Sequence, residues 1–112
     1  MSEYCPDAWV LLKFTSTEYG EIYKILAGWY GGYLNGDSWK INSGVTELKD
    51  AGTHWEVHGY SGSIYKCGKS TERIIGITSG ILNSLTETIK NSPGAELEVI
   101  DTQEYFDSLP KV

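Results

Sequence analysis

The chain has 112 residues, of which 40% are hydrophobic and 21% are charged, and it carries a net charge of −6. A chain of this length buries roughly two thirds of its unfolded surface, which is enough for a core without metal or disulfide staples. The 12% aromatic content and the apolar fraction argue against a disordered chain. We therefore expect a single domain over residues 1–112.

The acidic surplus is concentrated at the C-terminal end. Residues 95–112 carry five carboxylates against one lysine, and we expect about residues 102–112 to form a weakly ordered acidic tail. Arg73 is the only arginine. Because nucleic-acid binding needs several basic groups to displace counterions, this acidic balance disfavours it.

Sequence features also predict the compartment. Residues 1–6 include Glu3 and lead directly into a periodic segment, so we expect no signal peptide. The longest uncharged stretches, 25–36 and 74–86, are shorter than the roughly 18 residues of a membrane span, which predicts no membrane contact. Cys5 and Cys67 are too few for a disulfide framework, so we expect free thiols and a cytoplasmic location.

The first half of the chain has the two-residue period of β-strands. In residues 8–15, Val10, Leu12 and Phe14 share one face. Residues 21–29 also alternate, with Tyr23, Ile25, Ala27 and Trp29 on one face, although a helix through Ile22, Ile25, Leu26 and Trp29 competes. We favour the strand, because three glycines lie in or directly after this segment.

Turn signals then separate several short strands. Asn35-Gly36 predicts a hairpin turn before a strand over 39–42, with Trp39 and Ile41 inward and Lys40 and Asn42 outward. A bend is expected at Ser43-Gly44 before a strand over 45–48, and a hairpin turn over 49–52. Strands are predicted over 54–58 and 63–67, and a turn over 68–71 leads to a last strand of this series over 72–77.

The spacing of the apolar residues changes at Thr78 from a strand-like to a helical period. The apolar residues Ile81, Leu82, Leu85 and Ile89 fall on one helical face, which predicts a helix over about residues 79–91 with Thr78 or Ser79 as its N-cap. The segment 91–94 contains Pro93-Gly94, which predicts the end of this helix. Residues 95–100 then predict a strand with Leu97 and Val99 on one face.

These elements indicate a mainly β fold of the α+β class. Short strands joined by hairpin turns favour an antiparallel meander over repeated βαβ units. We expect a small sheet curled into a partly open barrel, similar in architecture to SH3-like and Sm-like barrels, with one amphipathic helix in the C-terminal half.

No motif predicts catalysis, a metal or a cofactor. Residues 63–70 approach a phosphate-binding P-loop, but position 63 is Ser where the motif needs Gly. His54, Glu56 and His58 share one strand face, and His54 and His58 lie about 13 Å apart, too far for one ion. We interpret them as a solvent-facing surface and assign no catalytic or metal-binding residue.

The most unusual feature is the supply of aromatic residues beside glycines. Four of them are candidate binding residues at strand ends: Trp29, Tyr30, Tyr33 and Tyr60. Exposed Trp and Tyr are typical interface anchors, which predicts a non-enzymatic interaction module that self-associates or docks on another protein. The alternative is a single-stranded nucleic-acid binder that stacks bases on Tyr30, Tyr33 and Tyr60. A weaker alternative is a small enzyme or sugar binder in the same aromatic region.

Overall fold

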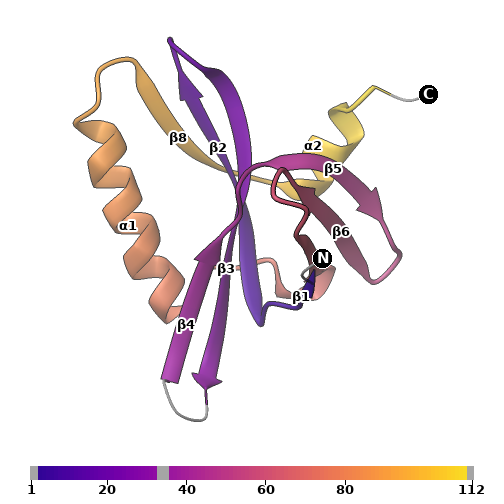
Figure 1. Ribbon diagram of the computed structural model, residues 1–112. Helices are drawn as coiled ribbons and strands as arrows, with labels where there is room; N and C mark the ends of the chain where they lie inside the picture. Colours follow the sequence, from indigo (N-terminus) through magenta and orange to yellow (C-terminus); the bar gives the residue numbers. More distant parts are fainter. Residues whose placement is uncertain (1–2, 33–35, 111–112) are drawn as a thin grey trace.

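The computed structural model describes residues 3–32 and 36–110 and contains three layers: an outer sheet, a central sheet and a helix (Figure 1). The central sheet has the order β4-β3-β2-β8, with β2 (Ala8–Ser16), β3 (Gly20–Gly32), β4 (Gly36–Ile41) and β8 (Ala95–Ile100). The outer sheet has the order β1-β7-β6-β5, with β1 (Glu3–Tyr4), β5 (Val45–Asp50), β6 (His54–Gly59) and β7 (Ile64–Gly68). Helix α1 (Gly76–Lys90) covers the other face of the central sheet, and α2 (Thr102–Ser108) lies beside the outer sheet.

The two middle strands of the central sheet are buried on both faces. Trp9 and Leu11 of β2 pack toward the outer sheet, whereas Val10 and Leu12 pack toward α1. The side chains of β3 alternate between the two faces in the same way. The strand predicted over 21–29 is therefore confirmed, and the alternative prediction of a helix is wrong. The long apolar runs of both strands therefore reflect burial on two sides.

The layer between the sheets is closed by α2. Trp55 of β6 is buried and packs against Phe106, with ring centroids 5.0 Å apart. Tyr105 packs on Tyr23 with ring centroids 4.3 Å apart. We expected residues 102–112 to be weakly ordered, but residues 102–108 form a helix, because these two aromatic side chains pack against the buried cluster between the sheets.

Helix α1 begins three residues before the predicted start. Its first residue is Gly76, so Thr78 lies in the first turn and is not the N-cap. The Thr78 hydroxyl accepts a hydrogen bond from the Ile75 N–H and donates one to the Ile75 carbonyl, both at 2.9 Å. At Gly28 on β3, an added Cβ would lie only 2.6 Å from the Thr78 Cγ2 atom, so this glycine permits the close approach of the helix.

The prediction of a strand over residues 72–77 is wrong. A 3-10 helix (Lys69–Thr71) follows β7, and Glu72 then forms a single parallel bridge with Trp9. The Glu72 carboxylate accepts hydrogen bonds from the Thr102 N–H at 3.1 Å and from its hydroxyl at 2.8 Å. The segment therefore connects the outer sheet to α1 and anchors the start of α2.

The mainly β class is confirmed, but the two sheets do not close into a barrel. The bend expected at Ser43-Gly44 is where the chain leaves the central sheet for the outer one. Asn42, expected to point outward, is buried there, and its Oδ1 accepts a hydrogen bond from the Ile25 N–H at 2.8 Å. Gly44 has a φ of +135°, and an added Cβ would lie 2.7 Å from the Tyr60 ring. Neither helix of the described residues is long and apolar enough to cross a membrane.

Candidate functional site

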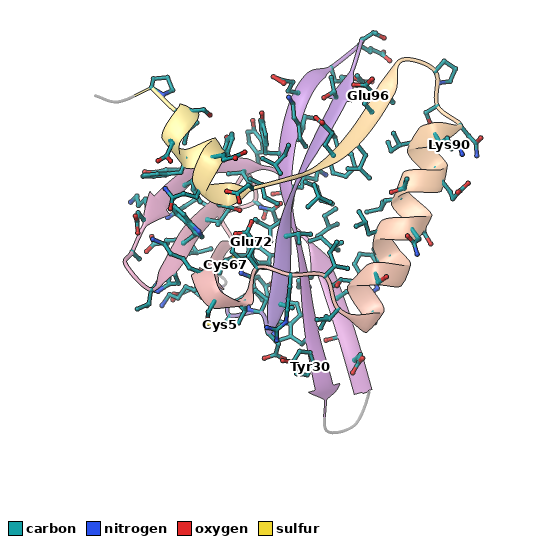
Figure 2. The ribbon with its side chains drawn as sticks, turned by 180° about the vertical axis from the view of Figure 1, so that it is seen from behind. Cys5, Tyr30, Cys67, Glu72, Lys90 and Glu96 are labelled. Atoms are coloured by element: carbon teal, nitrogen blue, oxygen red, sulfur yellow. The ribbon has the colours of Figure 1, made fainter. Side chains whose placement is uncertain are left out.

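Two of the predicted binding residues, Trp29 and Tyr30, are neighbours on β3 and point to opposite faces of the central sheet. The Trp29 indole N–H donates to the Cys5 carbonyl at 3.0 Å, and its ring makes an edge contact with Tyr4. Tyr30 is 48% exposed, and its hydroxyl accepts a hydrogen bond from Arg73 at 3.4 Å. Trp29 is thus part of the packing, and Tyr30 is on the surface (Figure 2).

The other two predicted residues are not part of the same surface. Tyr60 lies against Gly44, close to Ile22 at the opposite end of β3. Ile22 and Tyr30 are eight positions apart on that strand, which corresponds to roughly 26 Å. Tyr33 falls outside the described residues. The structure therefore does not bring Tyr30 and Tyr60 together as one stacking platform.

A small hollow lies where β4 meets the outer sheet. It has a volume of about 270 Å³ and is lined by Tyr4, Trp29, Ser38, Trp39 and Lys40. The Lys40 ammonium lies 5.4 Å from the centre of the Tyr4 ring. Trp39, which we expected to point inward, is 43% exposed. This hollow therefore combines aromatic surface and one cation along β4.

A larger groove separates the last turn of α1 from β8. It has a volume of about 410 Å³ and is lined by Thr86, Ile89, Lys90 and residues 95–98. Lys90 ends the helix on one side of this groove, and Glu96 lies on the strand opposite (Figure 2). A smaller, almost wholly apolar hollow shares Ile89 and Ala95 with it. The C-terminal half of α1 therefore leaves part of the central sheet uncovered.

The β8 side of this groove is a sheet edge. Within the described residues, β2 is the only strand that pairs with β8. The backbone N–H of Thr17 donates to the Gly94 carbonyl at 3.1 Å, so the hydrogen-bonded pairs continue as Thr15 with Glu96 and Lys13 with Glu98. The backbone N–H and C=O groups of Leu97 and Val99 therefore point away from the sheet.

The two faces of β8 differ in chemistry. Leu97 and Val99 lie on the α1 side, opposite Phe14 and Leu12 of β2, yet Val99 is 49% exposed. Glu96 and Glu98 project to the other face and are exposed. The alternation in residues 95–100 correctly predicted this strand, but only the topology shows that it is an edge.

Strand β4 forms the opposite edge of the same sheet. Its hydrogen-bonded pairs follow from the Asn42 N–H, which donates to the Ile25 carbonyl at 3.1 Å, and continue as Lys40 with Ala27. The backbone groups of Trp39 and Ile41 therefore point outward. Both side chains lie on the α1 side, whereas Lys40 lies on the face of the outer sheet, where its partner Ala27 packs.

The remaining polar candidates form structural contacts. His54, Glu56 and His58 share one face of β6, as predicted, and the His58 ring nitrogen Nε2 lies 2.7 Å from the Glu56 carboxylate. That hydrogen bond lowers the pKa of Glu56. Lys69 forms an ion pair with Asp50 at 2.7 Å, which lowers the pKa of Asp50.

The two thiols lie in different environments. Cys5 is exposed and Cys67 is buried, each as a free thiol, and burial raises the pKa of Cys67. Among residues 3–32 and 36–110, no three His, Cys, Asp or Glu side chains gather as a metal-binding group. No protein-family model, curated protein or solved structure matches this chain.

Proposed function

We propose that this protein is a non-enzymatic interaction module that binds a polypeptide in strand conformation at the β8 edge. The observation that carries the proposal is the set of outward-pointing backbone groups at Leu97 and Val99, beside a groove of about 410 Å³. An unpaired edge strand is a template for the addition of another strand. The half-exposed Val99 side chain supplies apolar area at the same place.

The chemistry of β8 defines the strand that it would bind. Side chains of an added strand alternate between the two faces of the sheet. On the α1 side they would meet Leu97, Val99 and the groove, which favours apolar side chains. On the other face they would meet Glu96 and Glu98, which favours lysine or arginine. The expected partner is therefore a segment of alternating apolar and basic residues.

We place this module in the cytoplasm, where buried and exposed cysteines both persist as free thiols. The acidic composition of the chain agrees with a basic partner strand, because complementary charges speed association and suppress wrong partners. An SH3-like or Sm-like barrel is not needed for this role, since the binding element is an open edge.

A peptide titration followed by NMR tests the proposal. The probe is a capped synthetic peptide of alternating valine and lysine, added to the isotope-labelled full chain, and the control peptide has glutamate in place of lysine. We expect the largest shift changes at the amides of Leu97 and Val99, and much weaker binding of the control peptide.

A matched variant tests whether the peptide binds at the β8 edge. Val99→Pro removes an outward-pointing N–H and leaves the ladder with β2 intact, so it blocks strand addition without breaking a native β-ladder bond. The variant should not bind the peptide. Shift changes confined to Tyr4, Trp29 and Lys40, or none at all, would contradict the proposal. Salt-sensitive changes at Tyr30 upon addition of a single-stranded oligonucleotide would favour the nucleic-acid alternative instead.

A further inference from the structure

The chain itself carries a strand that fits the β8 edge. We infer that β4 of one copy adds to β8 of a second copy, so that the central sheets join head to tail. This inference rests on the proposed function and names the partner strand. It depends on three properties of the two edges: direction, facing and charge.

Direction and facing agree without any rearrangement. Strands β2, β3, β4 and β8 are antiparallel to their neighbours, so β4 and β8 run in opposite directions. A copy placed beside β8 in the same orientation therefore presents its β4 antiparallel to β8. Its α1 face also remains on the α1 side of the joined sheet, because the sheet simply continues.

The outward backbone groups limit the possible registers, and mutual cover of the two half-exposed side chains selects one of them. In an antiparallel pair, residues that exchange both hydrogen bonds lie directly opposite each other. Pairing Val99 with Trp39 of the second copy also pairs Leu97 with Ile41, and all four residues point their backbone groups outward. The two half-exposed side chains, Val99 and Trp39, thereby cover each other on the α1 side.

The same register places opposite charges together on the other face. Glu98 lies directly opposite Lys40 of the second copy, in a non-hydrogen-bonded pair where side chains approach most closely. Opposite charges at such positions stabilise a strand pair, and like charges destabilise it. A two-fold pairing of β8 with itself around Leu97 would place Glu96 opposite Glu98 twice, which disfavours that alternative.

The joined edges form a heterologous contact, in which two different surfaces of the same chain meet. Such contacts build rings when the rotation closes and open chains when it does not. Each added copy leaves one free β4 and one free β8. We therefore expect the average mass in solution to rise continuously with protein concentration, without stopping at a dimer unless a ring closes.

Complementary edge variants test the inference by sedimentation velocity on the full chain. Val99→Pro blocks β8 and leaves β4 intact, whereas Trp39→Pro blocks β4 and leaves β8 intact; the ladder bonds of β4 to β3 are unaffected. We expect the unmodified chain to associate reversibly and each variant alone to be monomeric. An equal mixture of the two variants should form a heterodimer and nothing larger.

Charge variants cover the case in which a proline variant fails to fold. Lys40→Glu and Glu98→Lys each change an exposed side chain and should each weaken association about ten-fold. The chain that carries both changes restores the opposite pairing and should recover most of that loss. Recovery in the double variant would support the Glu98–Lys40 register, and further weakening would overturn it.

The outcomes separate this inference from the proposed function. A chain that is monomeric at millimolar concentration but binds the valine–lysine peptide at Leu97 and Val99 would overturn the head-to-tail inference and leave the proposed function standing. A variant that is blocked at one edge and still dimerises alone would show two-fold pairing and also overturn it. A monomeric chain that binds no peptide would contradict both.

Discussion

The two faces of the central sheet differ in how completely they are covered. Toward the outer sheet, nine residues form a buried cluster sealed by strands and by α2. Toward α1, the buried apolar cluster of the described residues has three members, Val10, Leu12 and Leu26, and the apolar helix side chains that pack on them are all partly exposed. The same two strands thus supply a closed layer on one side and an open one on the other. From this difference we expect stability to reside mainly in the inter-sheet layer, whereas the proposed binding edge lies beside the less completely covered face.

The largest expected effect tests the closed layer. Trp9 is fully buried between the sheets, and its indole N–H donates to the Gly68 carbonyl at 2.8 Å. Trp9→Ala should lower the free energy of unfolding by about 3–5 kcal/mol through lost burial and a cavity. Urea unfolding followed by circular dichroism measures this loss. If Trp9→Ala lowered the free energy of unfolding by less than a truncation on the α1 side, the inter-sheet layer would not be the more stabilising one.

The second prediction concerns the anchor that closes this layer. Replacing Glu72 by Ala removes the acceptor for the N–H and the hydroxyl of the buried Thr102. Hydrogen bonds to a charged group contribute about 1.5–3 kcal/mol, so we expect a loss of about 2–3 kcal/mol. Hydrogen exchange should also become faster in α2 than in α1. Equal acceleration in both helices would show that Glu72 does not act through α2.

The third prediction tests the open layer. Leu85 lies on the predicted apolar stripe of α1 but is only partly buried. A fully buried leucine costs about 2–5 kcal/mol on replacement by alanine, so Leu85→Ala should cost less, about 1–2 kcal/mol. The same unfolding titration measures it, with Trp9→Ala as the reference. A loss as large as that of Trp9→Ala would show that both layers contribute equally.

The smallest effect is a pH dependence confined to the closed layer. Burial raises the pKa of Cys67 in the folded state, so above pH ~8.5 the unfolded chain loses a proton that the folded chain keeps. Stability should therefore fall as pH rises from 7 to 9, by roughly 1 kcal/mol or less. Tyr65, whose pKa burial raises to about 12, adds to this fall only above pH ~10.

Two measurements check the assignment to Cys67. Unfolding free energies at pH 7 and pH 9 should differ less in a Cys67→Ala variant than in the unmodified chain. A thiol reagent should label the exposed Cys5 rapidly and Cys67 only on unfolding. An unchanged pH dependence in the variant would place its origin elsewhere.

The aromatic candidates show why the site was harder to predict than the strands. Tyr30 and Tyr60 have the same local pattern, an aromatic residue next to glycine, but they lie at opposite ends of β3. Trp29 has that pattern too, and its ring is held by Tyr4 and the Cys5 carbonyl. Exposure depends on what packs against each ring from distant parts of the chain, and no local pattern contains that information.

The sequence alone determined most of the strands, the apolar stripe of α1 and the mainly β class, because side-chain periodicity is a local property of the backbone. Only the tertiary structure decided that the strands form two sheets, that residues 72–75 connect layers, and that residues 102–108 fold into a helix. It also decided that β4 and β8 are the edges of one sheet. Strand order depends on contacts between segments far apart in the chain, and the same alternating segment can form the middle or the edge of a sheet.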